Sequence, residues 1–283
     1  MSVAYTVERI GPRPSVGEKA RRDFDRAPVT PWLKRRQEED IASRLAELAE
    51  RLALCGLDMG SLNALSAVTE FEATYAARPT LDNEGGMMRY NAFWLFALVR
   101  MLRPSLIIES GTWKGLSSWL MAEAGSGSGA RLVSFDIAEH PERIENDRVE
   151  YRLGDWSEDP EFRDLPPDAL VVLDDHIPHL RRLGEVHARG GRLAFVDDDY
   201  PATALHATGS PPVPTVAMLT DERLTGDFEC AWRRDGKLYR HLSTEADRSA
   251  GRGLIAWSEP MPDLTRTGYL AQQGPATLVG LRG

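Results

Sequence analysis

The stretch Leu-Ile-Ile-Glu-Ser-Gly-Thr-Trp-Lys-Gly-Leu-Ser-Ser, residues 106–118, indicates the fold of this chain. Its apolar start predicts a buried strand that ends at Glu109, followed by a turn and a helix. Gly111 and Gly115 would let the backbone of that turn approach a ligand closely, because glycine has no Cβ and tolerates positive φ. A carboxylate at the strand end repels phosphate, so the pattern favours a ligand that carries an ammonium or sulfonium cation, or a hydroxyl.

The spacing Glu-x-Gly-x-x-x-Gly-x-Ser over residues 109–117 resembles the first motif of class I S-adenosylmethionine (SAM)-dependent methyltransferases. The resemblance is greatest to the catechol-type O-methyltransferases and the cephalosporin-hydroxylase-like proteins, and it covers roughly residues 83–200. It agrees with the preference for a cation, since SAM carries a sulfonium group and NAD and ATP do not. It implies an α/β fold with a Rossmann-like sheet of parallel strands and an antiparallel C-terminal strand.

Composition and charge narrow the class of protein. A length of 283 residues suits one large α/β domain, alone or with a helical extension. The net charge of −9 argues against a nucleic-acid partner. Cys55 and Cys230 form no disulfide framework and no metal-ligand spacing. Charged residues interrupt every apolar stretch that could serve as a signal peptide or membrane span, so we expect a cytoplasmic protein without a membrane partner.

The first third of the chain is predicted to be helical. Residues 1–30 are rich in Pro, Arg and Gly and predict a flexible arm. Residues 31–104 predict a helical N-terminal extension or cap. Its three helices are expected from Thr30 to Gly56, from Leu62 to Ala77, and from Arg89 to Leu102. These helices could pack on the core, cover the active site, or form a homo-oligomer contact.

Residues 105–283 alternate between strand and helix patterns and predict the methyltransferase domain. This alternation is typical of a parallel doubly wound sheet, which binds ligands beyond the carboxyl ends of its strands. Asp235-Gly236 predicts the turn of a C-terminal hairpin. The predicted strands are 106–109, 131–135, 149–153, 169–173, 192–196, 228–233, 237–242, 254–257 and 277–281, with helices at 116–124 and 178–188. The last four strands agree with the antiparallel end of a methyltransferase sheet.

Acidic residues at successive strand ends suggest how SAM would bind. Asp136, after the second strand, can accept hydrogen bonds from both ribose hydroxyls. Asp155, after the third, can accept the adenine amino group, and Trp156 can stack on the base. Asp174, after the fourth, lies where cofactor and substrate would meet.

The resemblance implies further cofactor contacts. The turn would hold the methionine part of SAM, Ser117 would bind its carboxylate near a helix N-terminus, and Gly86 and Met87 would cover the sulfur. The full predicted cofactor set is Gly86, Met87, Glu109, Gly111, Thr112, Trp113, Gly115, Ser117, Asp136, Asp155, Trp156 and Asp174.

Two further acidic clusters, at residues 174–175 and 197–199, predict a metal site. Neighbouring carboxylates repel unless a cation lies between them, and Mg²⁺ prefers oxygen ligands. Alignment with the family motifs places the ligands at Asp175, Asp197 and Asp198, with Asp174 and Asp199 as alternatives. Asp198 stands where the catechol-type enzymes have asparagine.

The candidate general bases are histidines beside these acids. The catechol-type enzymes place a lysine base two residues after the matching histidine, where this chain has Pro178. His176 or His179 would have to replace it, unless the metal alone acidifies the hydroxyl. The predicted catalytic residues are therefore Asp175, His176 and His179.

The sequence thus predicts a SAM-dependent methyltransferase that acts on a hydroxyl of a small molecule, of the kind found in secondary metabolism, with Mg²⁺ assisting. An oxidative enzyme of the cephalosporin-hydroxylase-like group and a non-catalytic SAM-binding protein remain alternatives. Each predicted acid also has a plain structural interpretation as a helix cap, a turn or a solvated loop residue. The acceptor is not identified by the sequence.

Overall fold

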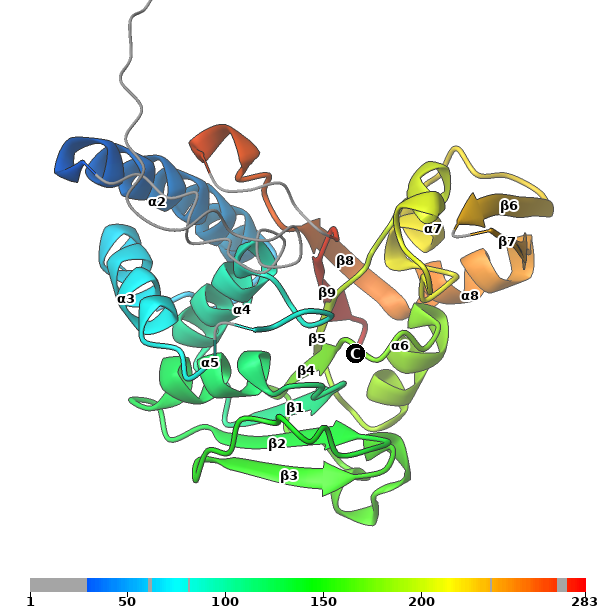
Figure 1. Ribbon diagram of the computed structural model, residues 1–283. Coiled ribbons are helices and arrows are strands. Elements are labelled where there is room, and N and C mark those ends of the chain that lie inside the picture. The colour runs from blue at the N-terminus through cyan, green and yellow to red at the C-terminus, as the bar shows by residue number, and fades with distance from the viewer. Residues whose placement is uncertain (1–29, 61–62, 81, 235, 269–273) are drawn as a thin grey trace, which may run out of the picture.

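A seven-stranded sheet forms the centre of the computed structural model, which describes residues 30–60, 63–80, 82–234, 236–268 and 274–283 (Figure 1). Its strand order is β3-β2-β1-β4-β5-β9-β8. The first five strands are parallel, and β9 is antiparallel to both β5 and β8. The strands are β1 (Leu106–Ser110), β2 (Arg131–Asp136), β3 (Val149–Leu153), β4 (Leu170–Leu173), β5 (Leu193–Val196), β8 (Ile255–Pro260) and β9 (Thr277–Leu281). This sheet confirms the predicted Rossmann-like methyltransferase architecture.

Helices cover both faces of the sheet because the central strands are apolar on both faces. Ile107 belongs to the hydrophobic core under one helical layer, and its neighbour Ile108 belongs to the core under the other. One layer contains α2 (Pro31–Leu54), α3 (Ala64–Ala76), α4 (Arg89–Leu102) and α5 (Leu116–Gly125). The other contains α6 (His179–Ala188), α7 (Val216–Thr220) and α8 (Glu245–Leu254) (Figure 1). The result is a three-layer α/β/α arrangement.

The N-terminal helices follow the sequence signals closely. The hydroxyl of Thr30 accepts a hydrogen bond from the amide of Leu33 at 3.3 Å, which caps α2, and Asn63 caps α3 through the amide of Ser66 at 2.9 Å. At the end of α4, Arg103 adopts the left-handed conformation, with φ of 48°. The face of α2 with the predicted periodicity is buried: Ile41, Leu45, Leu48 and Leu52. Apart from Thr30, the predicted arm lies outside the described residues.

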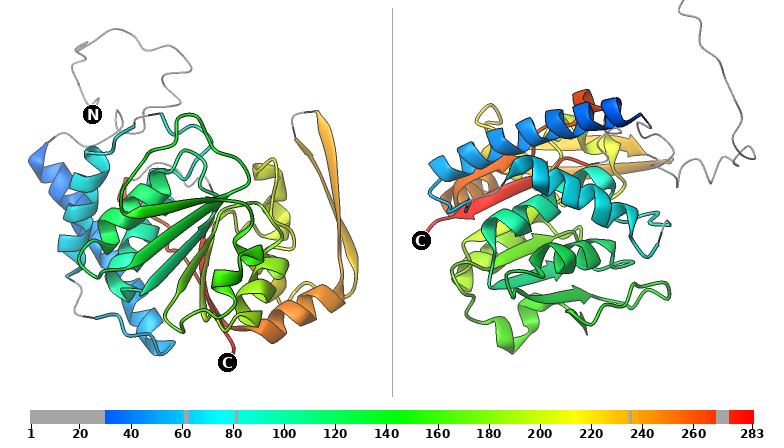
Figure 2. Two further views of the ribbon diagram at one scale, coloured as in Figure 1. Left: turned by 90° about the horizontal axis from the view of Figure 1, so that it is seen from below. Right: turned by 90° about the vertical axis from the view of Figure 1, so that its left-hand side faces the viewer.

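The C-terminal part departs from the sequence prediction in one respect. Strands β6 (Phe228–Arg234) and β7 (Lys237–Ser243) form the expected hairpin, but as a separate two-stranded sheet. Figure 2 shows this hairpin beside the molecule, away from the main sheet. Its inner face packs against a small cluster around Tyr200 and Met218. Helix α8, which the sequence pattern did not predict, separates β7 from β8, so only β8 and β9 complete the main sheet. Asp235 lies outside the described residues.

Within residues 30–60, 63–80, 82–234, 236–268 and 274–283, no helix is long and apolar enough to cross a bilayer.

Candidate active site

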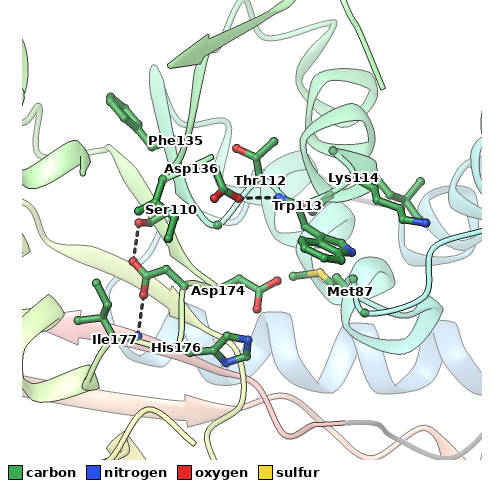
Figure 3. A pocket seen from close by; sticks show the side chains of 18 of the residues that line it. Met87, Ser110, Thr112, Trp113, Lys114, Phe135, Asp136, Asp174, His176 and Ile177 are labelled. Carbon is green, nitrogen blue, oxygen red and sulfur yellow. Dashed lines mark hydrogen bonds between the residues drawn. The ribbon is translucent and has the colours of Figure 1, made fainter. Parts of the chain in front are cut away.

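A cavity of about 350 Å³ lies beyond the carboxyl ends of β1–β4 (Figure 3). Its size is within the range of small-molecule sites, and its place is where open α/β sheets bind ligands. The predicted site residues that line it are Gly86, Met87, Gly111, Thr112, Trp113, Gly115, Ser117, Asp136, Asp155, Asp174, Asp175 and His176. Those that do not are Glu109, Trp156, His179, Asp197 and Asp198.

The turn after β1 depends on its glycines. Gly111 has φ of 102°, and a Cβ there would collide with the backbone oxygen of Asp174. Gly115, with φ of 76°, begins α5, and no described side chain caps that helix. The amides of its first turn, at Leu116 and Ser117, therefore lie at the cavity wall ready for an anionic group. The turn is built for close approach of a ligand, as the sequence predicts.

A segment from Asn83 to Met87, which we call the strap, lines the cavity, with Met87 on the side of Asp174 (Figure 3). The side-chain amide of Asn83 donates to the carbonyl of Met87 at 2.8 Å. The indole of Trp113 donates to the carbonyl of Glu84 at 3.0 Å and lies against Gly85. The strap is thus fastened to the glycine turn. It carries Gly86 and Met87 to the cavity wall.

Glu109 is fully buried beneath the turn rather than exposed to the cavity. One of its carboxylate oxygens accepts hydrogen bonds from the hydroxyls of Ser118 and Ser134, and the other has no hydrogen-bond partner among the described residues. Burial raises the pKa of Glu109, although hydroxyl donors oppose the shift. Here the carboxylate ties β1 to β2 and α5, which is a positioning role that the motif spacing did not indicate.

Asp136 reaches the cavity from the end of β2. One carboxylate oxygen accepts the amide of Trp113 at 2.9 Å, and the other accepts the amide of Ala138 at 3.3 Å. These contacts fix the carboxylate at the cavity wall (Figure 3). The Asp136 side chain can accept hydroxyl donors from a ligand there.

Asp155 and Trp156, adjacent in sequence, have different environments. Asp155 lines the cavity, and its Oδ1 accepts the amide of Ser157 and a guanidinium N–H of Arg182, both at 2.9 Å. Burial alone would raise the pKa of Asp155, but its contacts with Arg182 and Ser157 leave it lowered. Trp156 is fully buried in the core, under the guanidinium of Arg189. Trp156 therefore packs in the core and cannot stack on a base in this cavity, contrary to the sequence prediction.

Arg182, which the sequence analysis missed, joins these strand ends. Its side chain is only 2% exposed, and it contacts Asp175 Oδ2 through Nε at 2.7 Å and through Nη2 at 2.6 Å. It also contacts Asp155 at 2.9 Å and Glu185 at 2.6 Å. The sequence did contain a signal that Arg182 is buried and paired. Arg182 lies on the same buried face of α6 as His179, Leu183 and Val186, where a charged residue needs a partner.

Asp174 brings a carboxyl group into the cavity beside the strap. Figure 3 shows its side chain between Met87 and His176. Burial and the negative charges of Asp197 and Asp198 raise its pKa well above the usual value for aspartate. The neutral form of Asp174 is therefore favoured more than that of an ordinary aspartate.

His176 and His179 have different surroundings. The Nδ1 atom of His176 lies 3.3 Å from Oδ2 of Asp198, and its side chain is 50% exposed. Asp198 raises the pKa of His176 above 6.5, against the opposing effect of burial. Both residues have positive φ, 57° and 55°, a conformation that non-glycine residues adopt at an energetic cost.

By contrast, His179 is 2% exposed, and both of its ring nitrogens are occupied. Its Nε2 lies 3.1 Å from the carbonyl oxygen of Asp197, and its Nδ1 accepts the amide of Val216 at 3.2 Å. It joins α6, β5 and α7 and does not reach the cavity. Of the two candidate bases, only His176 lies where a base could act.

The predicted magnesium ligands do not converge. Asp175 is paired with Arg182, and Asp197 accepts the side-chain amide of Asn91 at 2.6 Å. Asp198 faces His176. Across the ranges that the structure describes, no group of three or more His, Cys, Asp or Glu side chains is placed to hold a metal ion. The donor set therefore does not fit Mg²⁺, and the alternative ligand Asp199 is hydrogen-bonded to Ala217 and Thr277.

Comparison with known proteins gives similarity in three-dimensional structure only. No protein-family model matches the chain, and no curated protein matches its sequence. An O-methyltransferase from Bacillus cereus in complex with S-adenosylhomocysteine (SAH) is 18% identical, with 76% of this chain and 90% of that chain covered and a TM-score of 0.44. TomG, an O-methyltransferase from Streptomyces achromogenes in complex with SAM, is 16% identical, with coverages of 82% and 95% and a TM-score of 0.41. A putative O-methyltransferase from Klebsiella pneumoniae is 13% identical, with coverages of 92% and 94% and a TM-score of 0.42.

Proposed function

We propose that this protein is a SAM-dependent methyltransferase that methylates a hydroxyl group of a small molecule. One observation carries the proposal. Asp155, Asp136 and Asp174, which lie at the ends of the parallel strands β3, β2 and β4, line a single cavity together with the glycine turn after β1, the strand between β2 and β4. Along this edge of the sheet, Asp155 suits the adenine amino group, Asp136 the ribose hydroxyls and Asp174 the sulfonium cation, which is the order of these groups in SAM.

The wall of the cavity offers a partner for each remaining part of SAM. The uncapped first turn of α5, at Gly115 and Ser117, suits the carboxylate of its methionine part, because free amides and the helix dipole both favour an anion. Gly86 and Met87 in the strap lie on the side of the cavity where Asp174 would meet the sulfonium.

When bound, SAM would supply an electrophilic methyl group and would leave as SAH, because the bond between its sulfur and the methyl carbon breaks as the new carbon–oxygen bond forms. The chain contributes alignment of the acceptor and removal of its proton. In this assignment a nitrogen of His176 takes the hydroxyl proton as the oxygen forms its bond to carbon, and Asp198 holds the ring through Nδ1 and stabilises the resulting imidazolium. Asp174 offers carboxyl oxygens near the cationic end of the cofactor, and a cation bound there would favour its ionised form against the raised pKa. The dyad of His176 and Asp198 would thus supply the general base that the catechol-type enzymes obtain from a lysine, without a metal ion.

Calorimetry with SAH tests the cofactor assignment directly. We expect saturable binding at one site per chain, competitive with SAM. Mass spectrometry of products from a panel of phenols, catechols and sugars then tests methyl transfer, through a mass gain of one methylene. Failure to bind either nucleotide would overturn the proposal. Product that gains an oxygen would support the oxidative alternative, and binding without turnover would support a non-catalytic role.

A further inference from the structure

We propose that Arg182 is a built-in cation that positions Asp155 and the 174–176 turn for cofactor binding, in place of a divalent ion. The inference rests on the proposed function and extends it to a residue outside the motifs. The guanidinium of Arg182 contacts groups at the tips of three strands: Asp155 after β3, Asp175 after β4, and Ser110 at the end of β1, whose hydroxyl lies 3.5 Å away.

The ion pairs of Arg182 with Asp155 and Asp175 are buried, unlike the many ion pairs on the surface of the chain. Arg182 is 2% exposed, and the side chains of Asp155 and Asp175 are 17% and 13% exposed. Charges so far from water interact strongly, and loss of one partner leaves the other buried and uncompensated. Asp221 and Arg223 form a comparison pair at 2.7 Å whose arginine is 88% exposed. The environment of Arg182 therefore gives it a large influence on its two carboxylates.

The contacts of Asp175 leave it little capacity to bind anything else. Its Oδ2 accepts the hydroxyl of Ser110 and two N–H groups of Arg182, and its Oδ1 accepts the amide of Ile177 at 3.1 Å. Asp175 is thus anchored, and its neighbours Asp174 and His176 are carried to the cavity wall. A metal ligand would need free lone pairs at this carboxylate.

The hydrogen bonds of Asp155, in contrast, are concentrated on one oxygen. Arg182 and the Ser157 amide both bind Oδ1, whereas Oδ2 forms a longer ion pair, at 3.6 Å, with the exposed Arg181. Oδ2 remains available to a donor in the cavity, such as the adenine amino group. Arg182 therefore orients the Asp155 side chain through Oδ1 and leaves Oδ2 to accept a hydrogen bond from a ligand.

Calorimetry with SAH, in EDTA and then in excess Mg²⁺, tests the inference on the full chain. We expect the wild-type affinity to agree within about twofold in the two buffers, and Arg182→Met to weaken it by more than about tenfold, as expected when one partner of a buried charge pair is removed. Arg182→Lys should lie between them, because lysine retains the charge but lacks the fork of donors. Arg223→Met is the surface control and should bind like wild type.

A double variant separates positioning from general loss of stability. Arg182→Met with Asp175→Asn removes both charges, and it should bind SAH at least about threefold more tightly than Arg182→Met alone. If circular dichroism shows that Arg182→Met does not fold, the SAH affinity of the double variant is compared with that of wild type instead. A loss of affinity greater than about a hundredfold would then contradict the inference.

Two results would overturn this inference but not the proposed function. One is that Arg182→Met binds SAH as tightly as wild type does. The other is that EDTA abolishes SAH binding by wild type and Mg²⁺ restores it. Wild-type protein that binds no SAH in either buffer would instead overturn the proposed function, and the cofactor role of Arg182 with it.

Discussion

The strand tips of β1–β3 and those of β4–β5 carry similar acidic residues but use them differently. At the first rim, the tips of β1–β3, the acids that line the cavity accept nearby backbone amides: Asp136 from Trp113 and Ala138, and Asp155 from Ser157. Asp155 also contacts Arg182 of α6. At the second rim, the tips of β4 and β5, Asp175 and Asp197 are held by side chains from distant elements, Arg182 in α6 and Asn91 in α4. Local amides therefore orient the acids of the first rim, whereas these two acids of the second rim depend on distant side chains and form part of the framework.

Strain is also divided between the two rims. His176 and Asp198 face each other from the tips of β4 and β5, and both have positive φ. Non-glycine residues persist in this conformation only when their surroundings enforce it, and such residues gather at functional sites. Trp113, in the turn after β1, also has a positive φ of 48°, so strained backbone lies at both rims. We expect the chemistry at the second rim because His176 lines the cavity there beside Asp198.

The largest effect should come from the second rim. We expect His176→Ala to lower kcat by about 10²–10⁴-fold, the usual contribution of a general base, while SAH affinity changes by less than about threefold. Steady-state kinetics and calorimetry on one preparation provide both values. His187→Ala, in the last turn of α6 and outside the cavity lining, is the control. A fall in kcat below about fivefold would leave the dyad without a catalytic role.

The next effect should come from the first rim. Asp136→Asn keeps the shape of the side chain but removes the charge that would accept two ribose hydroxyls. We expect SAH to bind about 10–100-fold more weakly, since hydrogen bonds to a charged group are worth about 1.5–3 kcal/mol. Calorimetry measures the change, with the exposed Asp147→Asn as the control. Wild-type affinity in Asp136→Asn would remove this residue from the ribose site.

The fold could be predicted from the sequence because its signals are local. Helix α4 and strand β9 have their predicted bounds, 89–102 and 277–281, and the other main elements lie within a few residues of theirs. Apolar runs ended by glycine, proline or aspartate specify such elements without reference to the rest of the chain. Helices α7 and α8 were missed because they are short or polar: α8, for example, buries only Arg248 and Gly251 fully.

The site was predictable only where backbone conformation decides it. Gly111 and Gly115 have the predicted positive φ, and Asp136 lies on the cavity as its position after β2 requires. Trp156 was predicted to stack on the adenine base, and His179 was a candidate to replace the lysine base of the catechol-type enzymes, yet both side chains are buried away from the cavity. Which way a side chain points at a strand end depends on partners from elsewhere in the chain, and one sequence does not reveal them.

A smaller effect should appear in the pH profile of the second rim. Asp198 raises the pKa of His176, and only neutral histidine can accept a proton, so wild-type kcat/KM should increase with pH through a midpoint above 6.5. Asp198→Asn should shift that midpoint towards lower pH and reduce the plateau, because the ring loses its orienting partner. Rates measured from pH 5.5 to pH 9 follow both changes. If the midpoint does not change in Asp198→Asn, Asp198 does not control the protonation of His176.

The smallest effect on binding should come from Glu109, the acid of the first rim that is buried below the turn. Glu109→Gln keeps an acceptor for Ser118 and Ser134, so SAH affinity should change by less than about threefold, in contrast to Asp136→Asn. Folding stability is the sharper measurement. Because burial raises the pKa of Glu109 in the folded state above 4.5, the folded protein binds this proton more tightly than the unfolded chain does.

The wild-type protein should therefore lose stability from this group as pH rises above 4.5, the ordinary pKa of glutamate, whereas glutamine has no proton to lose. Urea unfolding at pH 5 and pH 8 should show Glu109→Gln gaining about 1 kcal/mol or more relative to wild type at the higher pH. A relative loss at pH 8 would mean that the ionised carboxylate is stabilised in the fold. A tenfold loss of SAH affinity would return Glu109 to the cofactor site, and the two acids at neighbouring strand tips would then share one role.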